Sequence, residues 1–147
     1  MTEDDQVFRR PTLLERQRLL RLIDGPEPTQ HKQLEELRAD LRKQVDDGLV
    51  RPTGEPGSLE FQRGLASNKS HHPELEGRTW DTDGTPIDVI LFVTQDDFIY
   101  MMEVVCYGDE IRHIPPPGEW RVWVSRDGDT ANPPWPDSRG PGTREDG

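Results

Sequence analysis

The chain has 147 residues, of which 31% are hydrophobic and 32% are charged, and its formal net charge at pH 7 is −11. This length corresponds to one domain, but the low hydrophobic fraction and the 14 prolines and 13 glycines predict that the ends stay outside the core. We therefore expect a disordered N-terminus over 1–7, a single domain over 8–124 and a disordered, Pro- and Gly-rich tail over 125–147.

The negative charge is concentrated in one segment. Residues 74–119 contain eleven acids and two arginines, so this segment carries nine of the eleven net negative charges. An acidic surface attracts a basic protein and repels nucleic acid, whose binding needs clustered lysine and arginine. The charge therefore predicts a basic protein as the partner and excludes nucleic acid.

The sequence also indicates a compartment. Cys106 is the only cysteine, so the chain cannot form an internal disulfide, and a reducing compartment is favoured. Residues 1–5 are acidic and polar, unlike a signal peptide, and the apolar runs are too short for a membrane helix. We expect a cytoplasmic protein that does not bind membranes.

Two helices are predicted before residue 50. Thr12 and Glu15 have the spacing of a capping box at the start of the first helix, and Asp24-Gly25-Pro26 ends it. The second helix is indicated by apolar residues at spacings of three and four, and Gly48 ends it; these residues are Leu34, Leu37, Leu41 and Val45.

The pattern then changes to strands. Short strands are predicted at 49–52 and 58–62, a long loop over 63–78 and an edge strand at 79–82. The strongest strand signals are 87–94 and 98–107, joined by a short hairpin turn, and further strands are predicted at 111–114 and 119–124. In the second strand of the hairpin, one face is predicted to contain Phe98, Tyr100, Met102, Val104 and Cys106. The predicted fold is α+β, with two N-terminal helices packed on an antiparallel β-meander of about four to six strands.

The order of the motifs resembles a family of small bacterial proteins known only as a domain of unknown function. The resemblance covers about residues 8–122 and rests on Arg10-Pro11-Thr12-x-x-Glu15, Gly57-Ser58-Leu59-Glu60-Phe61, Asp83-Gly84-x-Pro86-Ile87 and Met102-Glu103-Val104-Val105. The family has Asp-Gly in its hairpin turn, whereas this chain has Asp96-Asp97. The resemblance implies a compact α+β domain and supplies no activity, cofactor or catalytic residue.

No recognised catalytic or metal-binding motif is present. The histidines lack the local spacing of zinc ligands, and Asp81-Thr82-Asp83-Gly84 does not match a calcium loop because its glycine comes at the fourth position. The acidic neighbours of Cys106 disfavour a reactive thiolate, which indicates a buried structural cysteine. We expect neither a cofactor nor a metal.

The function predicted from these patterns is a non-enzymatic binding domain, an immunity- or antitoxin-like partner of a basic protein. The predicted binding residues are the acids around the hairpin and one tryptophan: Asp96, Asp97, Asp109, Glu110 and Trp123. Trp123 has the opposite parity to Trp120 on the last strand, so it is either an exposed anchor or is covered by the tail or the first helix. A third interpretation is that the charge serves solubility alone.

The alternative function is a small enzyme or ligand carrier. Glu103 is the one charge among the apolar residues of its strand, and an inward-facing carboxyl group there would have a raised pKa. This hypothesis requires a pocket between the helices and the sheet that uses Glu103, Tyr100 or His113.

Overall fold

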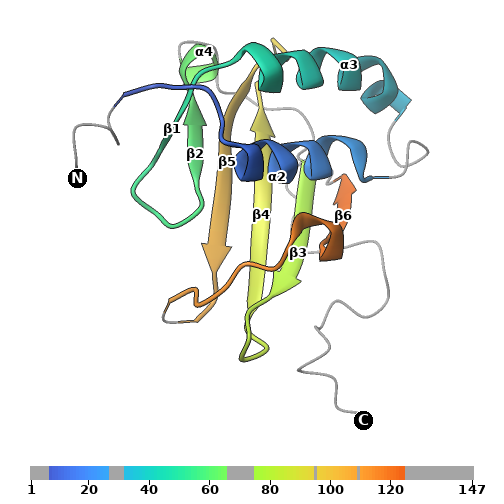
Figure 1. Cartoon of the computed structure of the whole chain (residues 1–147). Coiled ribbons are helices and arrows are strands. Elements are labelled where there is room, and N and C mark those ends of the chain that lie inside the picture. Colours follow the sequence, from blue (N-terminus) through green and yellow to red (C-terminus); the bar gives the residue numbers. More distant parts are fainter. Residues whose placement is uncertain (1–6, 27–31, 66–74, 95, 109, 125–147) are drawn as a thin grey trace.

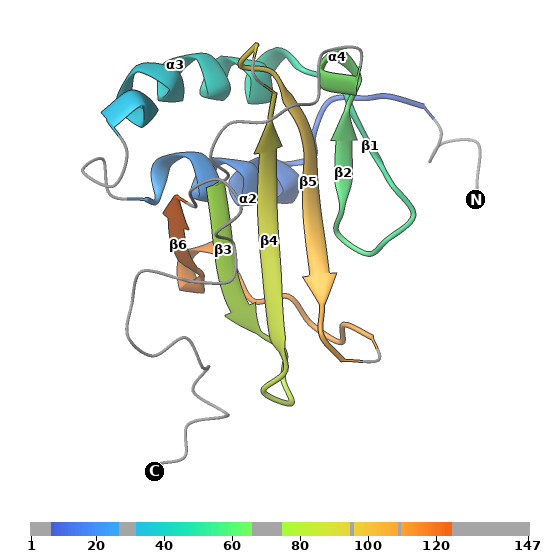
Figure 2. The ribbon, with the colours of Figure 1, turned by 180° about the vertical axis from the view of Figure 1, so that it is seen from behind.

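The structure is a computed structural model, and it describes residues 7–26, 32–65, 75–94, 96–108 and 110–124. Two helices, α2 (Leu13–Asp24) and α3 (Lys32–Asp47), lie on one face of a six-stranded antiparallel sheet (Figure 1). The view from behind shows the strands in front of α2, while α3 crosses the end of the sheet at which the β4–β5 turn lies (Figure 2). The predicted α+β class, with two N-terminal helices on an antiparallel sheet, is confirmed.

The sheet combines a meander with a returning strand. Its strands are β1 (Val50–Pro52), β2 (Leu59–Phe61), β3 (Leu75–Trp80), β4 (Pro86–Val93), β5 (Ile99–Cys106) and β6 (Arg121–Val124). The spatial order is β1-β2-β5-β4-β3-β6. Three consecutive strands, β3 to β5, form the meander, and β6 returns to pair with β3, which is the Greek key arrangement.

Three sequence-based predictions about this sheet are wrong. The segment predicted as a loop over 63–78 contains the start of β3, and the predicted edge strand at 79–82 is the end of β3, which lies inside the sheet because it pairs with both β4 and β6. Glu76 and Arg78 interrupt its apolar pattern and hide it in the sequence. The strand predicted at 111–114 does not form.

The core lies between the helices and the sheet. The helix-facing side chains of β4 are almost completely buried, and they join apolar residues of α2; the β4 residues are Ile87, Val89, Leu91 and Val93. Such one-sided burial is the main favourable contribution to folding. Arg21 at the end of α2 also donates to the carbonyl oxygen of Trp120 at 2.6 Å, which connects the helix to the chain just before β6.

An irregularity in β5 exchanges two side chains between the faces of the sheet. Leu91 pairs with Met102, but Val93 pairs with Ile99, so the register shifts between them. Ile99 is therefore buried in the core at 1% exposure, whereas Tyr100 packs against Phe92 on the other face, with ring centroids 5.6 Å apart. The predicted single face from Phe98 to Cys106 is wrong at Tyr100 for this reason.

The helix layer depends on one buried arginine. The capping box of α2 forms as predicted, with Thr12 and Glu15 bonded to each other's backbone. At the other end of α2, Arg38 of α3 is 7% exposed and donates to the carbonyl oxygens of Ile23 and Pro26. These bonds satisfy carbonyl groups that a helix end leaves without partners, and they hold α3 against α2.

Replacing this arginine will destabilise the domain. Arg38→Met keeps the aliphatic stem but leaves two buried carbonyl groups without donors, so we expect the free energy of unfolding to fall by about 2–4 kcal/mol. Urea denaturation followed by circular dichroism measures the change. The matched control is Arg42→Met on the same helix, whose exposed ion pair with Asp24 contributes little. Equal urea midpoints for the two variants would contradict the role of Arg38.

Candidate functional site

The acids predicted to bind a partner lie at two ends of the sheet. Asp96 and Asp97 are in the turn between β4 and β5, while Glu110 follows β5, and Asp109 lies outside the described residues. The eight residues of β5 separate the two groups by roughly 27 Å at the usual rise of a strand. The predicted acids therefore do not form one continuous binding surface.

Trp123 is not an exposed anchor. It is 1% exposed and pairs across the sheet with Glu76, which is also buried. Trp120 is 2% exposed and donates its indole N–H to the carbonyl oxygen of Pro115 at 3.0 Å. Opposite parity along the strand places the two rings on different faces of the sheet. Both rings are nevertheless buried, so Trp123 cannot be a binding residue on the surface.

The three residues of the enzyme alternative do not converge. Glu103 pairs with Ile90 and lies between Met102 and Val104, which face the helices, so its side chain is on the opposite face of the sheet. Tyr100 is on that face as well, whereas His113 is exposed in the loop that leads to β6. The space between helices and sheet is filled by apolar side chains.

A pocket of about 440 Å³ lies beside the β4–β5 turn. Its walls come from the C-terminal half of α3, from the short helix α4 (Gln62–Leu65) and from the start of β5. We call it the hairpin-end pocket and define it by Asp40, Lys43, Gln44, Asp47, Phe61, Arg63 and Phe98 among its lining residues. Its size is within the range of small-ligand pockets.

One side chain fixes the position of the turn against α3. Gln44 donates to the carbonyl oxygen of Asp97 at 2.6 Å and accepts from the backbone N–H of Ile99 at 2.8 Å. Asp97 has a φ of 71°, in the left-handed region that favours glycine. Gln44 thus holds an irregular turn at the rim of the pocket. Nothing in the sequence distinguishes Gln44 from the other polar residues of its helix.

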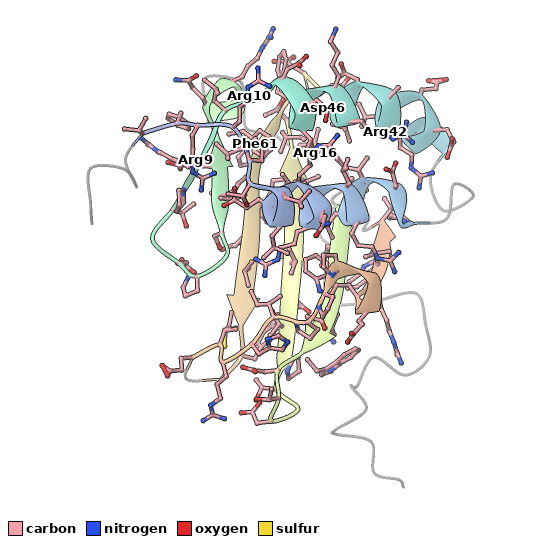
Figure 3. The ribbon with its side chains drawn as sticks, in the orientation of Figure 1. Arg9, Arg10, Arg16, Arg42, Asp46 and Phe61 are labelled. Atoms are coloured by element: carbon pink, nitrogen blue, oxygen red, sulfur yellow. The ribbon has the colours of Figure 1, made fainter. Side chains whose placement is uncertain are left out.

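A glycine allows α4 to form the opposite wall. A β-carbon at Gly64 would collide with the carbonyl oxygen of Ile99, so only glycine lets α4 approach β5 this closely. The guanidinium of Arg63 then lies over the ring of Phe98, 4.4 Å from its centroid. Phe61 contributes a largely buried ring to the pocket, and Figure 3 shows it beneath the C-terminal end of α3.

The charges of α3 form two rows with different surroundings. On the side of α2, Asp46 pairs with Arg16 and Arg42 pairs with Asp24, as Figure 3 shows for Arg16, Asp46 and Arg42 between the helices. On the side of the pocket, Asp40 and Asp47 are seven residues apart and share a face. Asp40 accepts a bond from Gln44, but within the described part of the chain neither carboxylate forms an ion pair.

A second polar group lies on the sheet face away from the helices. Asp88 is 4% exposed and accepts two bonds from Arg78, at 2.6 and 2.9 Å, and a third from the hydroxyl of Tyr107 at 2.8 Å. Burial of the hydroxyl and its bond to the Asp88 carboxylate raise the pKa of Tyr107 to about 12, although much of the ring is exposed. The group compensates a buried charge, which is a structural role.

Asp81 also has a structural role. Its carboxylate accepts the backbone N–H groups of Thr82, Arg112 and His113 at 2.7 to 3.0 Å, and these bonds lower its pKa. They fix the loop after β5 in a course that does not pair with the sheet, which explains the missing strand at 111–114. Together with Glu76 and Asp88, Asp81 shows that part of the acidic segment is internal.

Asp81 gives the domain a pH-dependent contribution to stability. Its pKa is lowered below the ordinary 3.8 by folding, so its contribution is complete above that value and is lost as the pH falls through the lowered pKa. We expect Asp81→Asn to lower the urea midpoint at pH 7, and the difference from the wild type to shrink as the solution is acidified below the ordinary value. The exposed Glu110→Gln is the control. A difference that stays constant with pH would contradict the assignment.

Tyr107 provides a direct spectroscopic test of the Asp88 group. The chain has two tyrosines, and we expect the phenolate absorbance of the wild type to include a step near pH 12 that Tyr107→Phe removes and Tyr100→Phe retains. The pKa is raised because the hydroxyl is partly buried and because ionisation would break its bond to Asp88 and place a second negative charge beside that carboxylate. If Tyr107→Phe removed only a step at about 10, the bond to Asp88 would not exist in solution.

The described residues contain no group of three or more His, Cys, Asp or Glu side chains that could hold a metal ion. None of the helices in these ranges is long and apolar enough to cross a membrane. No family model, no curated protein and no solved structure matches this chain. The resemblance to a family of small bacterial proteins therefore stays a prediction, and the function has to be argued from the geometry above.

Proposed function

We propose that this protein is a non-enzymatic binding domain that captures a basic protein, in the manner of an immunity or antitoxin protein. The binding surface is the end of the molecule where the hairpin-end pocket opens, and its acids are Asp40, Asp47, Asp96 and Asp97. The observation that carries the proposal is the pair of carboxylates on α3, Asp40 and Asp47, that border a pocket and form no ion pair within the described ranges.

The contrast with the other acids supports this location. Glu76, Asp81 and Asp88 are buried and serve the fold, so they contribute little to recognition. Asp96 is exposed in the hairpin turn, and the carbonyl oxygen of the next residue, Asp97, accepts a bond from the pocket residue Gln44. The exposed carboxylates of Asp40, Asp47 and Asp96 contribute to a negative field that steers a basic partner towards this end.

The arginines of the helix layer do not form a phosphate-binding surface. Arg9 pairs with Glu15, Arg16 with Asp46 and Arg42 with Asp24, so a carboxylate balances the charge of each of these three arginines. Figure 3 shows Arg9 and Arg10 towards the N-terminal side of α2, Arg16 between the two helices and Arg42 further along α3. This distribution supports a protein partner over nucleic acid, whose phosphates need a cluster of cations.

The enzyme alternative receives no support from the geometry. Glu103, Tyr100 and His113 lie apart, and the first two are on the face opposite the helices. A catalytic constellation requires its groups within hydrogen-bond reach of one reacting centre.

Charge reversal will show which end of the molecule binds the partner. The variant Asp40→Lys/Asp47→Lys/Asp96→Lys places three cations at the pocket, and we expect it to lose a partner that immobilised wild-type protein retains from a host lysate. The partner, identified by mass spectrometry, will be basic. Its association rate with the wild type will fall about tenfold between low and physiological ionic strength, because the steering field is screened.

The matched control makes the same change of charge elsewhere. Glu55→Lys/Glu110→Lys/Glu119→Lys alters three exposed acids that do not line the pocket, and it will retain the partner. Circular dichroism establishes that both variants fold. The proposal is wrong if both variants retain the same proteins as the wild type, or if the association rate is independent of salt.

A further inference from the structure

We propose that the hairpin-end pocket receives a single arginine or lysine side chain of the partner, so that this side chain is the anchor of the complex. The inference rests on the proposed function, since it names the group of the basic partner that enters the site. It is carried by three features of the pocket: its apolar lining, its carboxylates and the basic groups that the same elements already bind within the chain.

The lining suits a side chain that is apolar along its stem and charged at its end. Phe98 and Leu49, which is 38% exposed, line a space of about 440 Å³, and Phe61, which is 3% exposed, lies at its base with little accessible surface. The stems of arginine and lysine bury readily against such groups while the charged end reaches a polar rim. Asp40 and Asp47 provide that rim.

The same helix end already binds arginine on its other side. Arg10 donates to the carbonyl oxygen of Asp46 at 3.1 Å, and Arg16 donates to the carboxylate of Asp46 at 3.0 Å. The last turn of α3 contains no basic residue of its own, so cations from elsewhere complement its carbonyl groups and acids. A partner's cation beside Asp47 would complete this arrangement on the pocket side.

A guanidinium also binds an aromatic ring of the pocket within the chain. Arg63 lies 4.4 Å from the centroid of Phe98. This contact occupies Arg63 at the wall, and Lys43 lies on α3 between the two acids, so the lining by itself has no net charge. Asp96 and Asp97 in the adjoining turn make the mouth of the pocket negative, which favours a cation over an anion.

Amino-acid derivatives test the pocket without the partner. We expect N-acetyl-arginine methylamide and N-acetyl-lysine methylamide to shift the amide resonance of Gly48, a lining residue, in nuclear magnetic resonance titrations. The Gly118 resonance will stay unchanged, because its residue does not line the pocket. The dissociation constant will be on the order of 1 mM, as is usual for a ligand of this size. N-acetyl-norleucine methylamide and N-acetyl-glutamate methylamide will bind at least about tenfold more weakly.

Conservative variants test whether the two carboxylates of the pocket bind the cation. Asp40→Asn and Asp47→Asn preserve side-chain size, and each will weaken binding of the arginine derivative about fivefold or more by removing a charge at the rim. Glu36→Gln, an exposed acid on the same helix outside the pocket, will leave it unchanged. The inference is overturned if the norleucine or glutamate derivative binds as well as the basic ones, if Gly48 does not shift, or if neither asparagine variant weakens binding.

The outcome separates this inference from the proposed function. If the charge-reversed protein loses a basic partner but the derivatives do not shift Gly48, the domain captures its partner without an anchor in the pocket, and only the inference fails. If the derivatives bind at the pocket but the wild type retains no basic protein beyond those retained by the charge-reversed variant, the pocket is real and the proposed function fails.

Discussion

The pairing of β4 with β5 is the interaction on which the rest of the structure depends. These two long strands form the centre of the sheet, and the helix-facing side of β4 is buried along its whole length. Every other layer is placed relative to this pair: β2 adds to β5, β3 adds to β4, and α2 packs over the apolar face. The register shift near the end of the pair has a local consequence as well, because it turns Ile99 inwards, and Ile99 and the preceding Phe98 line the hairpin-end pocket.

The pocket is produced by contacts between elements that are distant in the sequence. The end of α3 reaches the β4–β5 turn through Gln44, and α4 reaches β5 because position 64 has no side chain. A buried arginine holds α3 against α2 and so fixes the direction in which the acids of α3 face. The proposed recognition surface is therefore part of the rigid frame and needs no separate loop to form it. Pre-formed sites of this kind lose little ordering entropy when a partner binds.

The helices, the class of fold and the central hairpin follow from local patterns that the sequence contains. The capping box at Thr12 and the alternation in β4 are examples, because each involves neighbouring residues only. Strand β3 could not be predicted, since Arg78 within it is compensated by Asp88 on the next strand. The burial of Trp123 and the structural role of Asp81 could not be predicted either, because each depends on residues that are distant in the sequence. Within the candidate site, the acids of the turn could be recognised from the charge pattern. Asp40 and Asp47 could not be recognised, because only the folded structure places α3 beside the turn.

The return of β6 to β3 has a consequence for how the chain is made. A ribosome releases β3, β4 and β5 before β6, so β3 is an open edge of the growing sheet until residue 124 has emerged. The contact of α2 with this part of the chain is also delayed, because Arg21 bonds to the carbonyl oxygen of Trp120, which is synthesised 99 residues later. An open edge strand can pair with a strand of another chain, and long-range closure slows folding. A nascent chain that stalls before residue 121 will therefore expose a strand that the finished protein keeps inside its sheet, and it is at this stage of synthesis that the protein is most vulnerable to aggregation.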